Sequence, residues 1–527
     1  MRQAHPTMSA GEIPASTNIL VIGGGPAGSF AAATLARDGF EVTLLEREHF
    51  PRYQIGETML PSMRTFLRFI GAEQKVADFG FEVKPGAALK LSQTKREGYT
   101  DFVNPNPKNH SWNVTRGEFD EILLRHASES GARVIEGVSV TQVKFSPEND
   151  KQPVSAEWKS DARSMGEIKF NWLVDASGRN GIMSTRYLRN RKFSKTLRSI
   201  AWWGYWTGTN KYSPGTSREN APWFEALSDE SGWAWFIPLH GGKVSIGFVL
   251  REDVGKAKKA EVSGPDPNVE HYHNQFKFVP GLKKLLGNAQ FLGEVKSAGD
   301  YSYNATAYGG PHFRIAGDAG AFIDPLFSSG VHLAFSSALS AACTIVASIR
   351  GQCTEEQAIQ FHTEKTEVSY TRFMIVVLGV YKQITSQEFP VLADIDEDNF
   401  DRAFAFLRPV IQGASDIDPT VTKEMVQKTI DFCAHATGFF TDPEMEKEVS
   451  KRINPELMVT NGPIMGPNTI AATAGDDEQA KLVLQRLNAR KAIIGIKGFE
   501  PNFRGECFGG FAMVAERGNL GLAGVAA

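Results

Sequence analysis

Three glycines near the amino end have the spacing of a phosphate-binding turn. Gly23, Gly25 and Gly28 form the pattern G-x-G-x-x-G, with Pro26 and Ala27 between the last two. In such a pattern the first glycine permits a tight turn, the second lets a pyrophosphate approach the backbone, and the third lets a helix pack closely on a strand. Backbone N–H groups at the start of that helix bind the phosphates. The pattern therefore predicts a dinucleotide site.

The segments around these glycines strengthen the prediction. The chain has 50 glycines among 527 residues, so the pattern alone is weak evidence. Here an apolar strand at Asn18–Ile22 precedes it, an alanine-rich helix follows to about Asp38, and a second strand at Glu41–Leu45 ends at Glu46. This order is a βαβ unit, and an acidic residue after its second strand suits a free ribose hydroxyl rather than a 2′-phosphate. We expect bound FAD, with Glu46 among its ligands.

Composition and charge exclude several classes of protein. The net charge of −3 provides neither a basic stripe for nucleic acid nor a polybasic membrane patch. The four cysteines are widely spaced and include no C-x-x-C pair, so neither a metal site nor a disulfide framework is expected. Residues 1–17 lack the apolar core of a signal peptide, and the apolar stretch Phe322–Ala347 is interrupted by polar residues, so no membrane span is expected. We expect a cytoplasmic protein.

The rest of the pattern predicts an α/β fold in which an antiparallel sheet interrupts the FAD-binding domain. Strands alternating apolar and polar residues, an amphipathic helix at about Glu118–Gly131 and a long apolar helix at Gly330–Ile349 support this division. We expect the C-terminal lobe to be mainly helical and the glycine-rich tail 518–527 to be disordered. The expected parts are a flexible N-terminus (1–17), a discontinuous FAD-binding domain (18–190 and 296–350), an inserted β-sheet substrate domain (191–295) and a helical C-terminal lobe (351–527).

Further motifs carry a resemblance to a known family. The glycine pattern followed by a late Gly317-Asp318-Ala319 beside Asp324-Pro325 resembles the FAD monooxygenases related to p-hydroxybenzoate hydroxylase. Within that superfamily, three features resemble the flavin-dependent halogenases. These features are a W-x-W-x-x-P pattern in a chain with only 9 tryptophans (Trp233–Pro238), the segment Ile55-Gly56-Glu57-Thr58 with Pro61, and a lysine, Lys84, within Phe81–Ala87. The resemblance covers about residues 18–350.

The resemblance implies which residues hold the cofactor. In the superfamily the late aspartate, here Asp318, contacts the ribityl chain of FAD, and the helix that follows points its N-terminus at the flavin ring. Arg52 and Arg116 match positions that reach the cofactor. A helix-capping role for Asp318 and a surface location for either arginine are the alternatives.

The resemblance also implies a reaction. Reduced FAD (FADH2) from a separate reductase activates oxygen, and chloride held near Ser329 and Gly330 is oxidised to hypochlorous acid, which crosses a tunnel to Lys84. The lysine either hydrogen-bonds this species or becomes a chloramine, and an apolar tunnel lowers its pKa toward the neutral amine. Lys90 is a rival for that role. Trp233 and Trp235 would separate the substrate from the flavin, and bromide is an expected alternative halide.

One position bears on the substrate. Tryptophan halogenases carry a glutamate where this chain has Phe327, whereas halogenases of phenols and phenolic polyketides, including fungal ones, resemble the version here. An electron-rich phenolic small molecule is the expected substrate. An FAD-dependent aromatic hydroxylase is the enzymatic alternative, and a flavoprotein without catalytic activity is another. His332 is interpreted as a core histidine, and the apolar stripe Met374–Val377 is expected to pack the C-terminal lobe, although such stripes can line an aromatic pocket.

Overall fold

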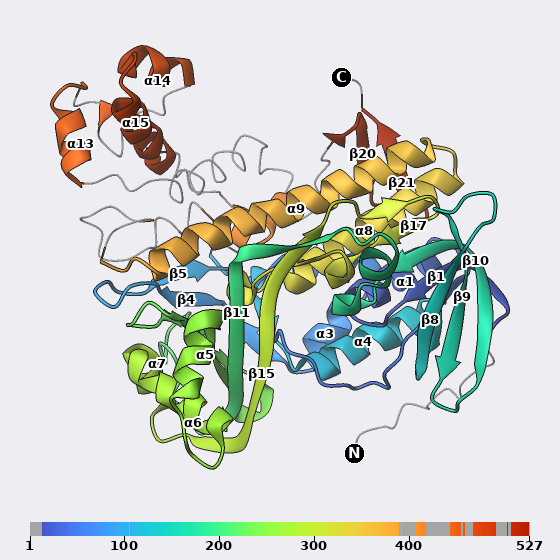
Figure 1. The fold of residues 1–527 in the computed structure, drawn as a ribbon, viewed down its shortest axis with the longest axis horizontal. Coiled ribbons are helices and arrows are strands. Elements are labelled where there is room, and N and C mark those ends of the chain that lie inside the picture. The colour runs from blue at the N-terminus through green and yellow to red at the C-terminus, as the bar shows by residue number, and fades with distance from the viewer. Residues whose placement is uncertain are drawn as a thin grey trace.

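The computed structural model describes residues 13–104, 106–388, 392, 404, 407, 409–417, 443–454, 457–458, 467–491, 503 and 507–525. Two large sheets lie side by side, and two long helices run along them (Figure 1). Most of the predicted flexible N-terminus lies outside the described residues, but its last two residues already belong to the first strand, β1 (Ser16–Ile22).

The first sheet contains the predicted nucleotide-binding unit. β1, α1 (Pro26–Arg37) and β2 (Val42–Leu45) form the βαβ unit, and β1 pairs in parallel with β2 and with β10 (Met165–Asp175). All four residues of β2 are buried, as expected for a parallel strand covered on both faces. The other strands are β16 (Gly309–Gly310), β17 (Phe313–Ile315), β7 (Arg133–Ile135), β8 (Val138–Phe145) and β9 (Pro153–Ser160).

The second sheet is the predicted insert, extended by strands from elsewhere. Its order is β18 (Ala321–Phe322), β15 (Gln290–Ala305), β11 (Arg191–Thr207), β14 (Lys243–Arg251), β13 (Gly232–Pro238), β12 (Trp223–Ala226), β4 (Gly86–Lys90) and β5 (Gly98–Asp101). Hydrogen bonds between β12 and β4 thus attach a segment that precedes residue 191 by about a hundred positions. Sequence periodicity could not reveal this pairing.

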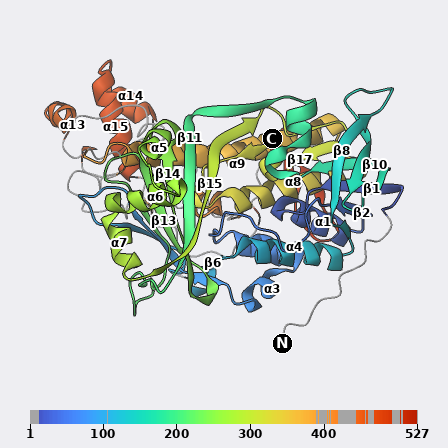
Figure 2. The same cartoon turned by 60° about the horizontal axis from the view of Figure 1, so that its bottom comes forward.

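Alternation along β11 separates the two faces of this sheet. Trp202 packs with the core around α6 (Pro267–Asn274) and α7 (Pro280–Leu286), whereas Trp203 packs with Trp235 and residues of α9 (Glu355–Ile384). Both sides of the sheet are therefore covered, with α5 (Glu252–Ala260), α6 and α7 on the outer face (Figure 2).

The helix α8 (Gly330–Ile349) is the central helix beside the first sheet. It packs on α1, where the rings of Phe30 and Phe335 stack at 4.7 Å, and on α9. Among the described residues, α8 alone has the length and apolar composition of a membrane-spanning helix. However, 89% of its most apolar 18-residue stretch is buried inside the protein. The remaining helices of this part are α2 (Met63–Ile70), α3 (Glu73–Asp78) and α4 (Arg116–Glu129).

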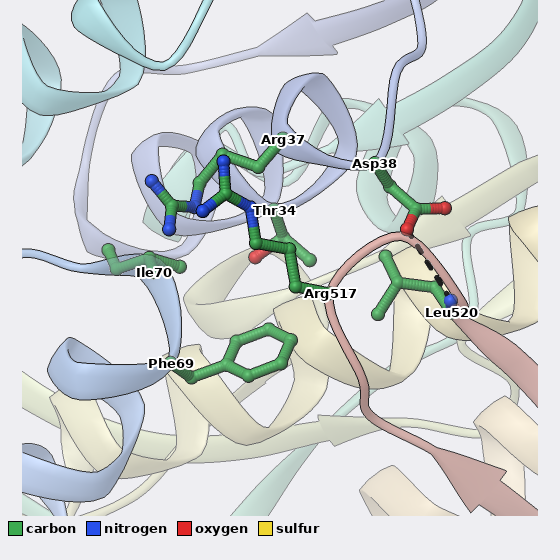
Figure 3. Close-up of a pocket in the computed structure, with 7 residues that line it drawn as sticks. All are labelled: Thr34, Arg37, Asp38, Phe69, Ile70, Arg517 and Leu520. Carbon is green, nitrogen blue, oxygen red and sulfur yellow. Dashed lines mark hydrogen bonds between the residues drawn. The ribbon is translucent and has the colours of Figure 1, made fainter.

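The prediction of a disordered tail was wrong for residues 518–525. β19 (Cys507–Phe508), β20 (Phe511–Val514) and β21 (Gly521–Gly524) form an antiparallel sheet that packs on α8. Leu520 is buried in the main core, and its N–H group bonds Asp38 beside a small pocket between Arg37 and Arg517 (Figure 3). The other described C-terminal elements are helical: α11 (Ala414–Ile417), α13 (Pro443–Ser450), α14 (Pro467–Ala474) and α15 (Glu478–Lys491).

Candidate active site

The glycine turn between β1 and α1 leaves an open cradle at one position. Gly23 has a φ of +101°, and a Cβ there would lie 2.4 Å from the Ala176 carbonyl oxygen. A Cβ on Gly28 would lie 1.9 Å from the Gly23 carbonyl oxygen, so these two glycines are required by the fold itself. A Cβ on Gly25 would meet only the Arg52 guanidinium, at 3.7 Å. The space in front of Gly25 therefore fits a pyrophosphate rather than a packing partner.

Glu46 and the start of α1 flank that space. The carboxylate of Glu46 accepts hydrogen bonds from the backbone N–H groups of Gly24 and Glu48. Pro26 stands at the first turn of α1, where a missing N–H is tolerated, and Ala27 is buried in the core beside it. The acidic residue thus lies at the end of β2 and beside the turn, as ribose recognition requires.

Next to the cradle, Arg52 and Arg116 both donate hydrogen bonds to the carboxylate of Asp120, a residue that no sequence motif indicated. Arg116 Nε and Nη2 donate to Asp120 at 2.9 and 3.0 Å, and Arg52 Nη1 donates to the same carboxylate at 2.8 Å. Burial opposes the charge of Arg116, but Asp120 outweighs it and raises the pKa of the guanidinium. Asp318 lies in the short turn Gly317–Ala319 after β17, where Arg116 is the charged neighbour that affects it most. Its own pKa is raised by burial, which Arg116 and two further arginines partly offset.

Lys84 is the most unusual cation among the described residues. It ends β3 (Glu82–Lys84), which pairs with β6 (Ser111–Asn113), and only 2% of its surface is exposed. Its Nζ donates to the Met59 carbonyl oxygen at 3.0 Å and lies 5.1 Å from the centre of the Phe102 ring. Burial lowers the pKa of Lys84 to about 7. A neutral, nucleophilic amine is therefore well populated at neutral pH.

The rival lysine has a different environment. Lys90 lies on β4 at intermediate exposure, and its Nζ donates to the carbonyl oxygen of Lys95 in the adjoining loop at 2.7 Å. The Lys90 side chain thus stabilises that loop and is not enclosed by the protein as Lys84 is. The geometry therefore favours Lys84.

The two tryptophans of the W-x-W-x-x-P pattern share one face of β13. Their ring centres are 6.0 Å apart, and both are almost fully buried. Trp235 Nε1 donates to Ser245 at 3.1 Å, and Trp233 Nε1 donates to Tyr381 on α9 at 2.8 Å. The Tyr381 hydroxyl in turn donates to Asp324 at 2.5 Å. These bonds fix both indole rings in a wall between the second sheet and α9.

The predicted halide residues lie where α8 begins. Ser328 adopts a left-handed conformation (φ +57°), which turns the chain into the helix, and Ser329 is its N-terminal cap. Within the part of the chain that the structure describes, the buried Ser329 side chain has no hydrogen-bond partner, and a Cβ on the exposed Gly330 would meet nothing within 4 Å. Free N–H groups at the first turn of this 20-residue helix provide donors for an anion.

Several buried polar atoms in the segment after Gly56 and in β6 have no hydrogen-bond partner among the described residues. They include Glu57 Oε2, Thr58 Oγ1 and both side-chain atoms of Asn113, which lies opposite Thr58 in an isolated β-bridge. The segment that carries Glu57 also provides the carbonyls that accept from Arg116 and Lys84. Unsatisfied buried groups are costly unless a ligand or water completes them. The residues present therefore fit a cofactor with polar edges.

Comparison with known proteins identifies the family. The family model described as tryptophan halogenase matches residues 18–107 and 88–419. Over 518 residues, 97% of this chain and 99% of the relative, the sequence is 56% identical to the flavin-dependent halogenase armH1 of Armillaria mellea. The chain belongs to the flavin-dependent halogenases. It is also 48% identical over 526 residues to the flavin-dependent halogenase ascD of Acremonium egyptiacum, covering 97% of this chain and 93% of that one.

Solved structures agree with this assignment. The flavin-dependent halogenase CmlS is 25% identical, with a TM-score of 0.66 over 83% of this chain and 78% of its own. A triple mutant of the flavin-dependent brominase Bmp2 is 25% identical, with a TM-score of 0.65 over 75% of this chain and 95% of its own. The predicted family, enzyme class and α/β fold are confirmed, and FAD is the cofactor of this halogenase family. The hydroxylase alternative is disfavoured.

His332 belongs to a buried polar cluster of this halogenase. Its two ring nitrogens lie 2.8 Å from Ser62 Oγ and from Asp416 Oδ2. Asp416 also accepts from Lys365 and Ser369, and the charge of Lys365 is the main cause that holds the pKa of Asp416 well below its usual range despite burial. The cluster ties α11 to α8 and α9. The interpretation of His332 as a core residue agrees with this location.

The face of the halogenase lined by Trp233 and Trp235 is an apolar layer. Phe327, Val376 and Val377 belong to the same buried cluster, and Met374 packs against it. The apolar stripe of α9 therefore packs onto the tryptophan wall rather than elsewhere in the C-terminal lobe. Sequence reasoning missed this contact, as well as Asp120, although Asp120 follows Arg116 at the i+4 spacing of a helical ion pair.

Proposed function

We propose that this halogenase chlorinates, and also brominates, the electron-rich ring of a phenolic natural product of the polyketide type. The balanced reaction consumes FADH2, oxygen, chloride, one proton and the aromatic substrate, and gives FAD, the aryl chloride and two molecules of water. A separate reductase provides FADH2. We further propose a reducing cytoplasmic location, which is consistent with free thiols at Cys343, Cys353 and Cys507.

The assignment of FAD to the cradle is supported by the open space in front of Gly25 and by the charged groups beside it. When bound, reduced FAD provides the electrons that activate oxygen. Gly23, Gly25 and Gly28 form the turn at its pyrophosphate, Glu46 faces its ribose, and Arg52, Arg116 and Asp318 hold its remaining polar groups. Because Asp120 neutralises one of the two arginines, the local charge suits a dinucleotide rather than a free polyphosphate.

Lys84 carries the proposal. Hypochlorous acid is formed from chloride held by the backbone N–H groups of Ser329 and Gly330, and Lys84 receives it and directs it to the substrate. An amine with a pKa near 7 and no ion-pair partner among the described groups can bind the acid or form a chloramine. Trp233 and Trp235 keep the aromatic substrate away from the flavin, so that the halide alone is oxidised there.

The proposed substrate class rests on the apolar residues around Trp233 and Trp235, not on a contact with one particular group of the substrate. Phe327 lies in the apolar cluster at the place where a carboxylate would assist an indole, and a phenol that ionises needs less of that assistance. We also propose the division into an FAD-binding domain (18–190 and 296–350), a substrate domain (191–295) and a C-terminal lobe (351–527). The pocket then forms between the second and third of these parts.

A mass-spectrometric screen tests the proposal. Purified protein, a flavin reductase, NADH and FAD are incubated with phenolic polyketides in chloride or in bromide. We expect a product heavier by one halogen, with the isotope pattern of the halide provided, and none with Lys84→Ala. Products that gain only oxygen, independently of halide, would show a hydroxylase instead.

A further inference from the structure

A chain of hydroxyl groups joins the buried carboxyl of Glu57 to the protein surface. The Tyr205 hydroxyl donates to Glu57 Oε1 at 2.7 Å, and the hydroxyls of Tyr205 and Tyr53 lie 3.0 Å apart. Glu57 is 3% exposed, whereas Tyr53 is 52% exposed. The three side chains therefore cross the wall between the interior and the solvent by two consecutive hydrogen bonds.

The chain has a direction, because Trp203 fixes its outer end. Trp203 Nε1 donates to the Tyr53 hydroxyl oxygen at 2.7 Å, and an indole N–H can only donate. The single hydroxyl hydrogen of Tyr205 is committed to Glu57. In the contact between the two tyrosines, Tyr53 must therefore be the donor. All donors point inward, which is the arrangement that passes a proton from solvent toward Glu57.

The inner end of the chain lies beside the tryptophan wall. Among the described residues, Glu57 Oε2 has no hydrogen-bond partner other than the nearby Ser245 hydroxyl, which lowers the pKa of Glu57 against the larger effect of burial. Ser245 is the group that accepts from Trp235. Two residues after Glu57, the Met59 carbonyl accepts from Lys84. The carboxyl group is thus next to Ser245 of the tryptophan wall, and it lies two residues before the carbonyl group that holds Lys84.

We propose that Tyr53, Tyr205 and Glu57 form a proton relay that delivers one proton from solvent to the reaction chamber in each turnover. The inference rests on the proposed function, because conversion of chloride, oxygen and FADH2 consumes one proton for each chlorinated product. Glu57 releases its carboxyl proton into the chamber and takes the Tyr205 hydroxyl proton at Oε1. Tyr205 takes the proton of Tyr53, and Tyr53 takes one from bulk water. Rotation of the carboxyl group then presents the new proton inward, and nothing is oxidised or reduced.

The electrostatic surroundings allow Glu57 to exist in both protonation states. Burial raises its pKa from 4.5 to about 7, against the lowering effect of hydrogen bonds and of nearby positive charge. At the outer end, the Lys296 ammonium lies 4.6 Å from the Tyr53 ring centre and pairs with Glu294, whereas burial raises the pKa of Tyr53, so that its hydroxyl keeps its proton at rest. The groups that face the relay are Ser245 and Lys243 on β14, Arg116 on α4, and Glu294 and Lys296 on β15.

Conservative substitutions test the relay in the complete enzyme. Tyr205→Phe and Glu57→Gln each interrupt the chain without a change of shape, and we expect chlorination at pH 7 to slow about 10- to 100-fold. The affinity for FAD should be unchanged in Tyr205→Phe, because that hydroxyl contacts Glu57 and Tyr53. A small weak acid such as imidazolium should partly restore the rate of Tyr205→Phe. Tyr212→Phe is the matched control, because that hydroxyl donates to Glu97 at 3.1 Å away from the chain. Wild-type rates in both relay variants would overturn the proposal.

A second readout needs no flavin and no substrate. In the flavin-free protein, the infrared C=O band that disappears in Glu57→Gln should titrate near pH 7 and move to higher frequency in Tyr205→Phe, which removes its hydrogen bond. If the Glu57 carboxyl group stayed ionised down to about pH 5, so that its C=O band were absent at pH 7, the relay would be overturned. If the band behaves as expected but no phenol is halogenated by the wild type, the substrate proposal alone fails.

Discussion

Replacing Lys84 with methionine should stabilise the protein while it abolishes halogenation. Methionine matches the unbranched lysine stem and needs no hydration. In the unfolded chain the lysine has its ordinary pKa of 10.5, and burial lowers the pKa to about 7 in the folded protein. Each pKa unit corresponds to 1.36 kcal/mol, so at pH 7 the buried lysine destabilises the wild type by about 4 kcal/mol. Loss of the hydrogen bond to the Met59 carbonyl offsets part of the gain, which leaves a net increase of about 1–3 kcal/mol.

The pH dependence separates this charge effect from packing. A lysine with a lowered folded pKa contributes stability that is present above pH 10.5 and lost as the pH falls through about 7. The difference in unfolding free energy between Lys84→Met and the wild type should therefore shrink by about 2 kcal/mol between pH 7 and pH 9. Urea unfolding of both proteins at pH 7 and at pH 9 measures this difference. Lys90→Met, which removes the same charge from a half-buried site, is the matched control.

One result would refute the reasoning. If the stability difference between the wild type and Lys84→Met were the same at both pH values, the lysine would not be desolvated in solution. Its assignment as a neutral amine at neutral pH would then fail. Peroxide release without halogenated product from Lys84→Met, with FAD still bound, is the expected result in the activity assay.

Four further outcomes are expected. Gly25→Val should lose FAD, measured by fluorescence titration, while its melting temperature stays close to wild type, because the new side chain occupies open space. Gly330→Pro removes an N–H donor and conflicts with the helical conformation of the preceding residue, so the chloride concentration needed for half-maximal chlorination should rise at least tenfold; Gly330→Ala, which keeps the donor, should not change it. Tyr381→Phe removes the acceptor of Trp233 Nε1, which should lower the unfolding free energy by about 1–3 kcal/mol and broaden the set of halogenated positions in the product. In wild type, the rate of halogen transfer should increase as pH rises through about 7, because Lys84 loses its proton there, and stopped-flow product analysis measures this.

Local sequence was sufficient for the elements whose geometry is set by short-range rules. The βαβ unit follows from a glycine pattern between apolar strands, and Gly23 and Gly28 are required because a side chain at either would collide with backbone. α8 has the predicted bounds, since a 20-residue apolar helix is recognisable from its own residues, and the pattern Trp233–Pro238 lies wholly within one strand, β13. The glycine-rich tail shows the limit of such rules, because β21 is held by pairing with β20 and by burial of Leu520.

By itself, the sequence determined the halogenase family, the FAD fold and the identity of the candidate lysine, because these are written in residue types at fixed spacings. Only the tertiary structure decided what those residues can do. The pKa of Lys84 depends on Met59 and Phe102, which remove water from it, and desolvation is a property of the surroundings rather than of the residue. The chain from Tyr53 to Glu57 passes through Tyr205, about 150 positions away in sequence. Hydrogen bonds over that separation exist only once the second sheet has packed against the FAD-binding domain.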